Sequence, residues 1–293
     1  MKTNTTLSWI LLAFLACIWG SSFILMKKSL EVFTSNQVAA LRLFSAFLFF
    51  IPILLLRFKE IPNLKTVFYS FISGLTGTLL PAYCYATAGA HIDSSLSGLL
   101  NSMTPIFTLL LGVAFYRQQV VRVQLMGIGL GFIGSLLLIF GTGQSGSFSI
   151  NPYALLIVAA TVMYGINLNF SKKYLNQVHP ILLTTLMLST MAPICGVALF
   201  GSDFLERVSL PQAQWPLIYT LILGIFGSGV ATVLFYKILQ ITSPVVSSSV
   251  TYLIPIVAVM WGLLDGEKLY TQHFLGMATI LLGVYLVNRP AKS

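Results

Sequence analysis

The sequence predicts an all-α integral membrane protein with ten transmembrane helices arranged as two inverted five-helix repeats. Three observations lead to this fold class: the apolar composition, the spacing of charges and turn residues, and an internal similarity between the two halves. Of the 293 residues, 57% are hydrophobic and 8% are charged, whereas soluble domains carry about 25% charged residues. The apolar runs are long and do not alternate in polarity, so they predict membrane helices rather than the strands of a membrane barrel.

Ten apolar spans lie between the charged and turn-forming residues. We expect them at residues 7–25, 37–56, 67–89, 95–116, 123–140, 153–171, 180–200, 214–236, 245–264 and 270–288. The fifth and sixth spans are separated by "GTGQSGSFSINP" (141–152), whose small and turn-forming residues do not fit a continuous helix in lipid. The three cysteines are scattered within spans and predict neither a disulfide framework nor a metal site.

The distribution of basic residues predicts the orientation in the membrane. With a cytoplasmic N-terminus, eleven Lys and Arg residues fall in inner loops or termini, four fall in outer loops, and Arg42 lies within a span. This bias predicts that both termini lie in the cytoplasm, and we expect a multi-pass protein of a bacterial inner membrane. The net charge of +9 is therefore a topology signal, and we expect no nucleic-acid partner.

The two halves of the chain are similar to each other in the order of their motifs. Positions that match at shifts of 145 to 150 residues include Trp19 and Tyr164, Gly74 and Gly224, Gly77 and Gly227, Pro105 and Pro255, and Gly112 and Gly262. We expect one repeat in residues 1–143 and a second in residues 144–293. Because each repeat holds an odd number of spans, the second must cross the membrane in the opposite orientation, as in alternating-access transporters.

Several motifs resemble the EamA-type branch of the drug/metabolite transporter superfamily. They are "CIWGSSF" in the first span, "AALRLFSAF" in the second, the Pro-bearing fourth and ninth spans, and the terminal "GEKLYTQHFLGMATILLGVYL". The resemblance implies a ten-helix metabolite exporter with a central cavity formed mainly by helices 1, 3, 4, 6, 8 and 9. The family's Gly-Glu pair is present as Gly266-Glu267 in the second repeat, but Tyr116-Arg117 replaces it in the first.

A polar stripe along the fourth span predicts one wall of the cavity. Its members, spaced by three and four residues, are Ser94, Ser97, Asn101, Thr104 and Thr108, and the equivalent positions in the ninth span are Pro244, Ser247, Thr251, Ile254 and Ala258. We expect Ser97, Asn101, Ser247 and Thr251 to bind substrate, although hydrogen bonding between helices would also explain them. The wall from the fourth span should be the more polar one.

Pro105 and Pro255 fall within apolar runs that we expect to be helices. Proline inside a helix costs roughly 3 kcal/mol and leaves the carbonyl four residues earlier without its donor. The repetition in both halves favours a helix break or a gating role at these prolines. The alternative is that proline is simply more frequent in membrane helices than in soluble ones.

Aromatic and polar residues well inside the first, third and sixth spans are further candidates for substrate contact. They are Trp19, Ser22, Tyr83, Tyr164 and Asn167. Core packing is the rival explanation for the aromatic members of this set.

Arg42 is the only cation clearly within a span, and three roles are open to it. Its length allows it to reach the outer interface. It can instead pair with Glu31 or Asp93 at a gate, or bind a substrate carboxylate with two parallel hydrogen bonds.

These features predict a secondary transporter that exports a small polar or zwitterionic metabolite, such as an amino acid, by alternating access. No Asp or Glu occupies the middle of a span, which does not favour a proton-coupled exporter of cationic drugs; nucleosides and sugars are alternative substrates. The sequence shows no catalytic constellation, metal-ligand cluster or cofactor motif, so a membrane-embedded enzyme or receptor is the least favoured function. We expect a small-molecule substrate and the lipid bilayer as partners, and a monomer or weak homodimer.

Overall fold

The computed structural model describes residues 5–61, 63–118, 121–140 and 151–287. Helices and short connections account for all of these described residues. The α-helices are α1 (Thr5–Ser29), α2 (Ser35–Leu56), α3 (Leu64–Gly74), α4 (Leu80–Gly89), α5 (Ser94–Asn101), α6 (Thr104–Tyr116), α7 (Arg122–Phe140), α8 (Ala154–Tyr174), α9 (Pro180–Phe200), α10 (Phe204–Val208), α11 (Gln214–Ile222), α12 (Ala231–Ile241), α13 (Pro244–Ser248), α14 (Ile254–Leu264) and α15 (Thr271–Val287). Residues 141–150 of the predicted separating stretch 141–152, and with them the boundary between the proposed repeats, lie outside the described residues.

Seven helical segments in the described part of the chain are long and apolar enough to cross a membrane. They coincide with the first four and with the sixth, seventh and eighth predicted spans. Shorter apolar helices at Arg122–Gly134, Ile254–Leu264 and His273–Gly283 lie within the other three predicted spans. The protein is therefore an all-helical, multi-pass membrane protein, and the crossing of the membrane by all ten segments stays a prediction.

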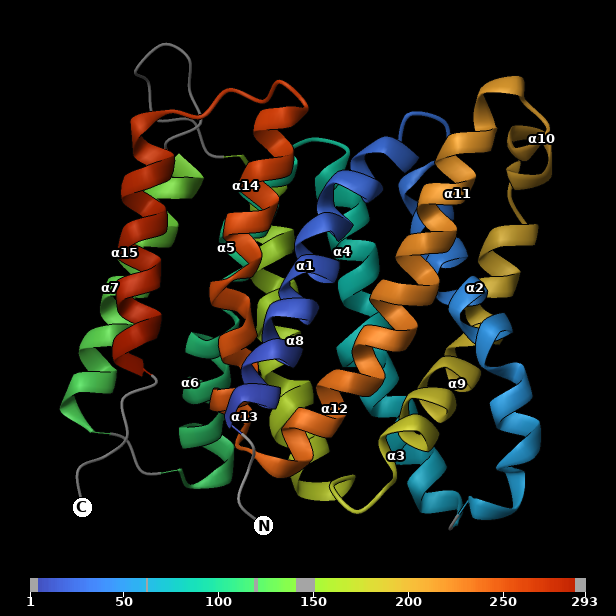
Figure 1. The fold of residues 1–293 in the computed structure, drawn as a ribbon, viewed down its shortest axis with the longest axis horizontal. Coiled ribbons are helices and arrows are strands. Elements are labelled where there is room, and N and C mark those ends of the chain that lie inside the picture. The colour runs from blue at the N-terminus through green and yellow to red at the C-terminus, as the bar shows by residue number, and fades with distance from the viewer. Residues whose placement is uncertain (1–4, 62, 119–120, 141–150, 288–293) are drawn as a thin grey trace.

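The helices form a bundle of roughly aligned rods (Figure 1). α7 and α15 pack together at one edge, α2 and α9 pack together towards the other, and α1, α4, α5, α8 and α12 lie between them. The first residues of α1 and the last residues of α15 lie at the same end of the bundle (Figure 1). α7 and α15 meet through glycines: a side chain at Gly283 would collide with the backbone of Gly131, as expected for closely packed membrane helices.

Two long helical segments change their winding midway. π-helical stretches, η2 (Leu75–Leu79) and η4 (Leu223–Val230), join α3 to α4 and α11 to α12. Each stretch contains a glycine of the repeated motif, Gly77 in η2 and Gly227 in η4. Because a π-turn holds more residues than an α-turn, it rotates the following side chains relative to a regular α-helix.

Two of the predicted spans, 95–116 and 245–264, are not single helices. The first ends as α5 at Asn101 and resumes as α6 at Thr104. The second is divided into α13, a 3₁₀ turn, η5 (Ser249–Tyr252), and α14. Both interruptions lie just before Pro105 and Pro255, the prolines that the sequence associated with a helix break.

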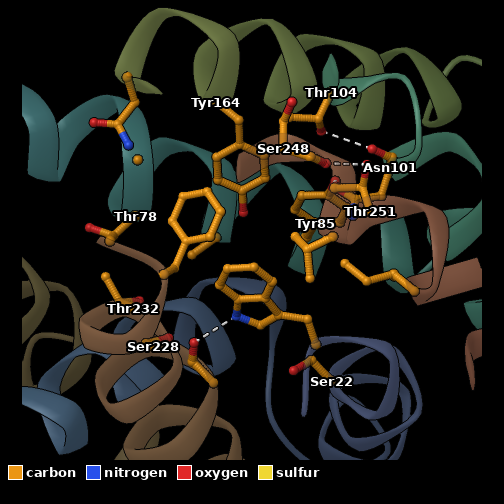
Figure 2. A pocket seen from close by; sticks show the side chains of 18 of the residues that line it. Ser22, Thr78, Tyr85, Asn101, Thr104, Tyr164, Ser228, Thr232, Ser248 and Thr251 are labelled. Carbon is orange, nitrogen blue, oxygen red and sulfur yellow. Dashed lines mark hydrogen bonds between the residues drawn. The ribbon is translucent and has the colours of Figure 1, made fainter. Parts of the chain in front are cut away.

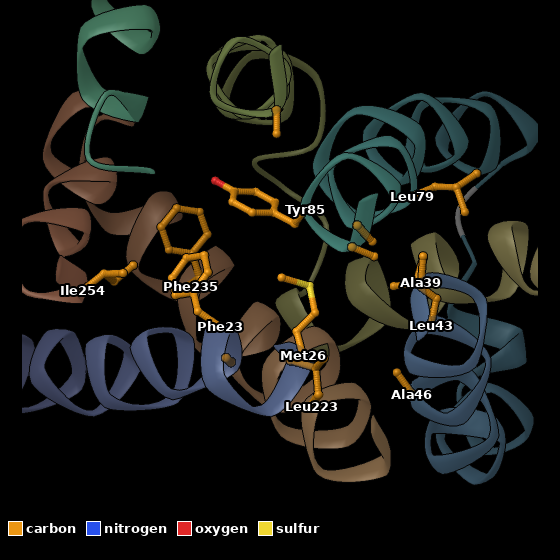
Figure 3. Close-up of a cluster of buried hydrophobic side chains, with 14 of the residues drawn as sticks. Phe23, Met26, Ala39, Leu43, Ala46, Leu79, Tyr85, Leu223, Phe235 and Ile254 are labelled. Carbon is orange, nitrogen blue, oxygen red and sulfur yellow. The ribbon is translucent and has the colours of Figure 1, made fainter. Parts of the chain in front are cut away.

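Apolar side chains from several helices fill the centre of the bundle. Phe23 and Met26 of α1 point towards Tyr85 of α4 and Phe235 of α12 (Figure 3), and the Phe23 and Tyr85 ring centroids are 5.7 Å apart. These buried side chains contact one another and not lipid. Such packing between helices stabilises a membrane bundle. This packing surrounds the cavity described next.

Candidate substrate cavity

A cavity of about 130 Å³ lies among seven helical segments. Its walls come from α1, α2, the η2–α4 segment, the α5–α6 break, α8, the η4–α12 segment and the α13–α14 region. Seven residues that the sequence singled out line it, namely Trp19, Ser22, Arg42, Asn101, Tyr164, Asn167 and Thr251. The helices implied by the family resemblance all contribute, and α2 adds Arg42 and Leu43.

The break between α5 and α6 places a polar corner on the cavity wall. Pro105 and Pro255 each occupy the second position of a new helix, where a missing N–H costs no helical hydrogen bond. The cost expected for a proline inside a helix therefore does not apply. The carbonyl of Asn101, expected to be free, accepts the hydroxyl of Thr104 at 2.8 Å. Neither proline lines the cavity, and both are buried beside it.

Asn101 and Thr104 form the cavity wall from the α5–α6 segment, and both are polar. The α13–α14 wall combines two hydroxyls, Ser248 and Thr251, with the apolar Val250 and Ile254. The expected difference in polarity between these two walls is present in the lining.

Tyr85 holds the Asn101 side chain in place. Its hydroxyl donates to Asn101 Oδ1 at 2.5 Å, and its ring stacks on that of Tyr164 with the centroids 6.1 Å apart. Figure 2 shows Tyr164, Asn101 and Thr104 on the same side of the cavity. The Asn101 amide nitrogen has no protein acceptor among the described residues, which leaves its N–H groups available to a solute.

A buried network of hydrogen bonds holds the Asn167 side chain in place. Its Oδ1 accepts the hydroxyls of Ser73 at 2.6 Å and Ser171 at 3.1 Å, and its Nδ2 donates to Tyr236 Oη at 2.9 Å. A Cβ at Gly77 would overlap the Asn167 amide. The network therefore joins α3, α8 and α12, and one N–H of Asn167 is left over for the cavity.

Trp19 and Arg42 both reach η4, the π-helical wall. Trp19 Nε1 donates to the carbonyl of Gly227 at 3.0 Å, and Arg42 Nε donates to Ser228 Oγ at 3.0 Å. Single π-turns within α-helices are frequent at functional sites. Among the described residues, no carboxylate lies within 4.0 Å of the Arg42 guanidinium. The prediction that Arg42 pairs with Glu31 or Asp93 is therefore wrong. The hydrogen bond to Ser228 also shows that the Arg42 side chain does not extend to the outer interface.

Three candidates from the sequence do not line the cavity. The Ser97 hydroxyl donates to the carbonyl of Asp93 and the Ser247 hydroxyl to that of Ser243, and both side chains are buried. Tyr83 packs against the hydrophobic core instead. The reason is helical phase: η2 rotates Tyr85 rather than Tyr83 onto the wall, and the α13–η5 junction presents Ser248 rather than Ser247.

Several lining residues were missed by the sequence reasoning. They are Phe23, Met26, Leu43, Thr78, Tyr85, Ser228, Thr232, Phe235, Tyr236, Ser248 and Val250. The missed residues of the η4–α12 segment come after Gly224 and Gly227, the glycines that match Gly74 and Gly77 in the first half. This repeated glycine pair was the sequence signal that could have pointed to them. Their side-chain directions depend on the π-turn, which residue spacing alone does not reveal.

A second polar cluster lies where α1, α5 and the connection after α14 meet. Glu267 accepts the backbone N–H and the hydroxyl of both Ser94 and Ser95, at 2.6 to 3.0 Å, and it pairs with Lys27 at 2.7 Å. Asp265 pairs with Lys27 at 2.8 Å and with Lys28 at 2.7 Å. We call Lys27, Lys28, Ser94, Ser95, Asp265 and Glu267 the ionic cluster. It connects α1 to the loop between α14 and α15, near the C-terminal end of the chain.

Burial alone would raise the pKa of Glu267, but hydrogen bonds from Lys27, Ser95 and Ser94 outweigh it and bring the pKa to about 2. Hydrogen bonds from Lys27 and Lys28 likewise lower the pKa of Asp265. Both carboxylates are thus ionised at neutral pH. The cluster is a fixed set of charges and not a proton carrier near pH 7.

Apolar helices around a cavity lined by hydroxyl, amide and aromatic groups define a multi-pass membrane protein with a candidate site for a small molecule. The chain belongs to the EamA-like transporter family, which matches it twice, over residues 7–140 and 151–289.

Relatives of similar length carry transporter names. The chain is 26% identical to an uncharacterized transporter of Archaeoglobus fulgidus, over 96% of this chain and 98% of the relative. It is 25% identical to the uncharacterized inner membrane transporter YedA of Escherichia coli, over 92% and 87% of the two chains. A solved crystal structure with 16% identity covers 95% of both chains at a TM-score of 0.66, a likeness in fold alone.

Proposed function

We propose that this chain is a secondary transporter that exports a small polar or zwitterionic metabolite, such as an amino acid, by alternating access. Ten helices cross a bacterial inner membrane as two inverted repeats, with both termini in the cytoplasm. The two matches to the family and the paired features of the halves support this arrangement: π-helical stretches at Gly77 and Gly227, and helix breaks before Pro105 and Pro255.

The cavity lining is the single observation that carries the proposal. Both halves contribute to it, and its side chains offer amide, hydroxyl and aromatic contacts with one cation and no carboxylate. Transporter sites lie at repeat interfaces beside broken helices, which is the position of Asn101 and Thr251. A cationic drug would lack a countercharge among these lining residues, so this alternative substrate class is less well supported.

Alternating access requires that the two ends of the pathway open in turn, and we propose the ionic cluster as the contact that closes the outer end. The positive-inside bias of the loops assigns the α14–α15 connection to the outside. The cluster joins α1, α5 and that connection, so it must separate for the outer end to open.

Solute counterflow into proteoliposomes tests the function. Purified protein is screened with amino acids, nucleosides, sugars and cationic dyes, and we expect saturable flux of at least one amino acid. Asn101→Ala and Trp19→Ala should each reduce that flux about tenfold or more, because they remove groups from the cavity wall. Gln212→Ala and Trp215→Ala, at exposed positions, are the matched controls. Normal flux of every identified substrate in both cavity variants would contradict the assignment of the site.

A further inference from the structure

Arg42 is a cation without a countercharge on the wall of the cavity. Its Nε is tied to Ser228, while its two Nη groups have no protein acceptor among the described residues. The six ion pairs in the described chain involve Lys27, Lys28, Arg57 and Arg207, and none involves Arg42.

An unpaired guanidinium in a membrane helix is costly, because a buried charge without a partner loses its hydration. A bound anion would offset this cost. Arginine presents its N–H groups in a planar fork that matches a carboxylate with two parallel hydrogen bonds. With Nε held by Ser228, the remaining Nη edge is oriented and free to take that role.

We propose that Arg42 binds the carboxylate of the transported solute, and that this contact restricts transport to solutes that carry a carboxylate. The inference rests on the proposed transport function and names its substrate class. Ser228 acts as a positioning residue, because its hydroxyl fixes the guanidinium through Nε. Arg42 has no counterpart in the second half of the chain, so the repeats supply only one anion site.

The far side of the cavity suits the other end of a zwitterion. Figure 2 shows Ser228 on one side of the cavity, and Asn101 and Thr251 on the other. The Thr104 and Thr251 hydroxyls donate to the carbonyls of Asn101 and Ser248, so their oxygens can still accept hydrogen bonds from an ammonium group. The aromatic faces of Trp19 and Tyr164 can add cation–π attraction. A solute anchored at Arg42 by its carboxylate can therefore direct its ammonium towards this side.

The test compares a carboxylic acid with its amide on the same protein. Proteoliposomes are loaded with unlabelled leucine, and the uptake of external labelled leucine is measured. Unlabelled leucine, leucinamide or isopentylamine is added outside as competitor. The other amino acids are screened in the same way. We expect free amino acids to compete and their amides and amines to compete at least tenfold more weakly. Arg42→Gln should abolish this discrimination, and Arg42→Lys, which keeps the charge but loses the fork, should restore it in part.

Controls separate a binding role from a structural one. Arg57→Gln lies at the exposed end of the same helix, where Arg57 pairs with Glu60, and should retain the discrimination. Ser228→Ala should weaken competition by leucine with little change in the maximal rate. Each variant is checked for an unchanged elution profile in detergent.

Outcomes divide cleanly between the two proposals. Equal competition by acid and amide in the unmodified protein, or flux of a carboxylate-free solute that Arg42→Gln does not affect, overturns the role of Arg42 and leaves transport intact. The absence of saturable flux for every solute overturns the transport function, and the inference with it.

Discussion

The ε-amino group of Lys27 lies 2.7 Å from the carboxylate of Glu267, although the two residues are 240 positions apart in the chain. Lys27 is in the last turn of α1, and Glu267 follows α14. The same carboxylate receives the N–H groups at the start of α5, where a negative charge is favourable. One side chain thus joins three separate segments at one end of the bundle.

Replacement of Glu267 by glutamine should destabilise this end of the protein. The amide keeps one acceptor for the serines but loses the ion pair with Lys27, and hydrogen bonds to charged groups are worth about 1.5–3 kcal/mol. We expect a lower thermal unfolding temperature in detergent. Glu60→Gln is the control, because Glu60 forms an exposed pair with Arg57, and such pairs contribute little; an equal shift in both variants would argue against the cluster.

The same substitution should open the outer end more often. In a background without native cysteines, Met26→Cys places a thiol on the cavity wall, at the residue before Lys27 of the cluster. We expect an impermeant maleimide added from outside to label it faster when Glu267 is replaced by glutamine. Labelling that is equally fast with intact Glu267 would show that the cluster does not close the pathway.

The contribution of Glu267 should be constant near neutral pH and disappear in acid. Its pKa of about 2 lies below the value of about 4.3 expected for an unfolded chain. A lowered pKa stabilises the fold above the unfolded value, and this stabilisation is lost as the pH falls from there towards 2. The difference in unfolding temperature between the parent and Glu267→Gln should therefore be flat from pH 5.5 to 7.5 and shrink below about pH 4.

The titration of Asp93 has to be eliminated from the comparison of unfolding temperatures. Burial, and after it the nearby charge of Glu267, raises the pKa of Asp93, so replacement of Glu267 also changes the titration of Asp93. Asp93→Asn is introduced into both chains for this reason. A difference that still changes between pH 5.5 and 7.5 would mean that Glu267 itself titrates there.

Gly224→Ala should displace α2. A methyl group at Gly224 would overlap the backbone carbonyl of Arg42 and the hydroxyl of Ser45, and overpacking of this kind costs about 1–3 kcal/mol. The shift also moves Arg42 relative to Ser228, so the apparent affinity for substrate should fall. Gly129→Ala is the control, since a Cβ there meets no atom within 4 Å, and it should be neutral or slightly stabilising.

Tyr85→Phe should loosen Asn101. It removes the donor to Asn101 Oδ1, and a buried acceptor left without a partner costs about 1–3 kcal/mol. We expect lower thermal stability and a severalfold higher KM for substrate. Tyr83→Phe, two residues earlier and outside the cavity lining, should leave both quantities unchanged; a larger effect at Tyr83 would favour the assignment made from the sequence.

The sequence by itself determined the helical, membrane-embedded class and most segment positions. Runs of about 20 apolar residues leave no other stable structure in lipid, because every backbone polar group must be paired within the segment. It also indicated nine substrate-binding candidates, six of which line the cavity together with Arg42. Polar residues within apolar runs are costly, so they point to a protein-facing surface wherever they occur.

Only the tertiary structure decided which side of each helix faces the cavity. The π-turn before Tyr85 and the 3₁₀ turn after Ser248 change the helical phase by a fraction of a turn, which residue spacing counted along an ideal helix cannot register. Likewise, the prolines were visible in the sequence, but their place in the first turn of a new helix was not. The contacts of Arg42 with Ser228 and of Lys27 with Glu267 join residues 186 and 240 positions apart. Such pairs depend on how the helices pack against one another, so local sequence patterns do not predict them.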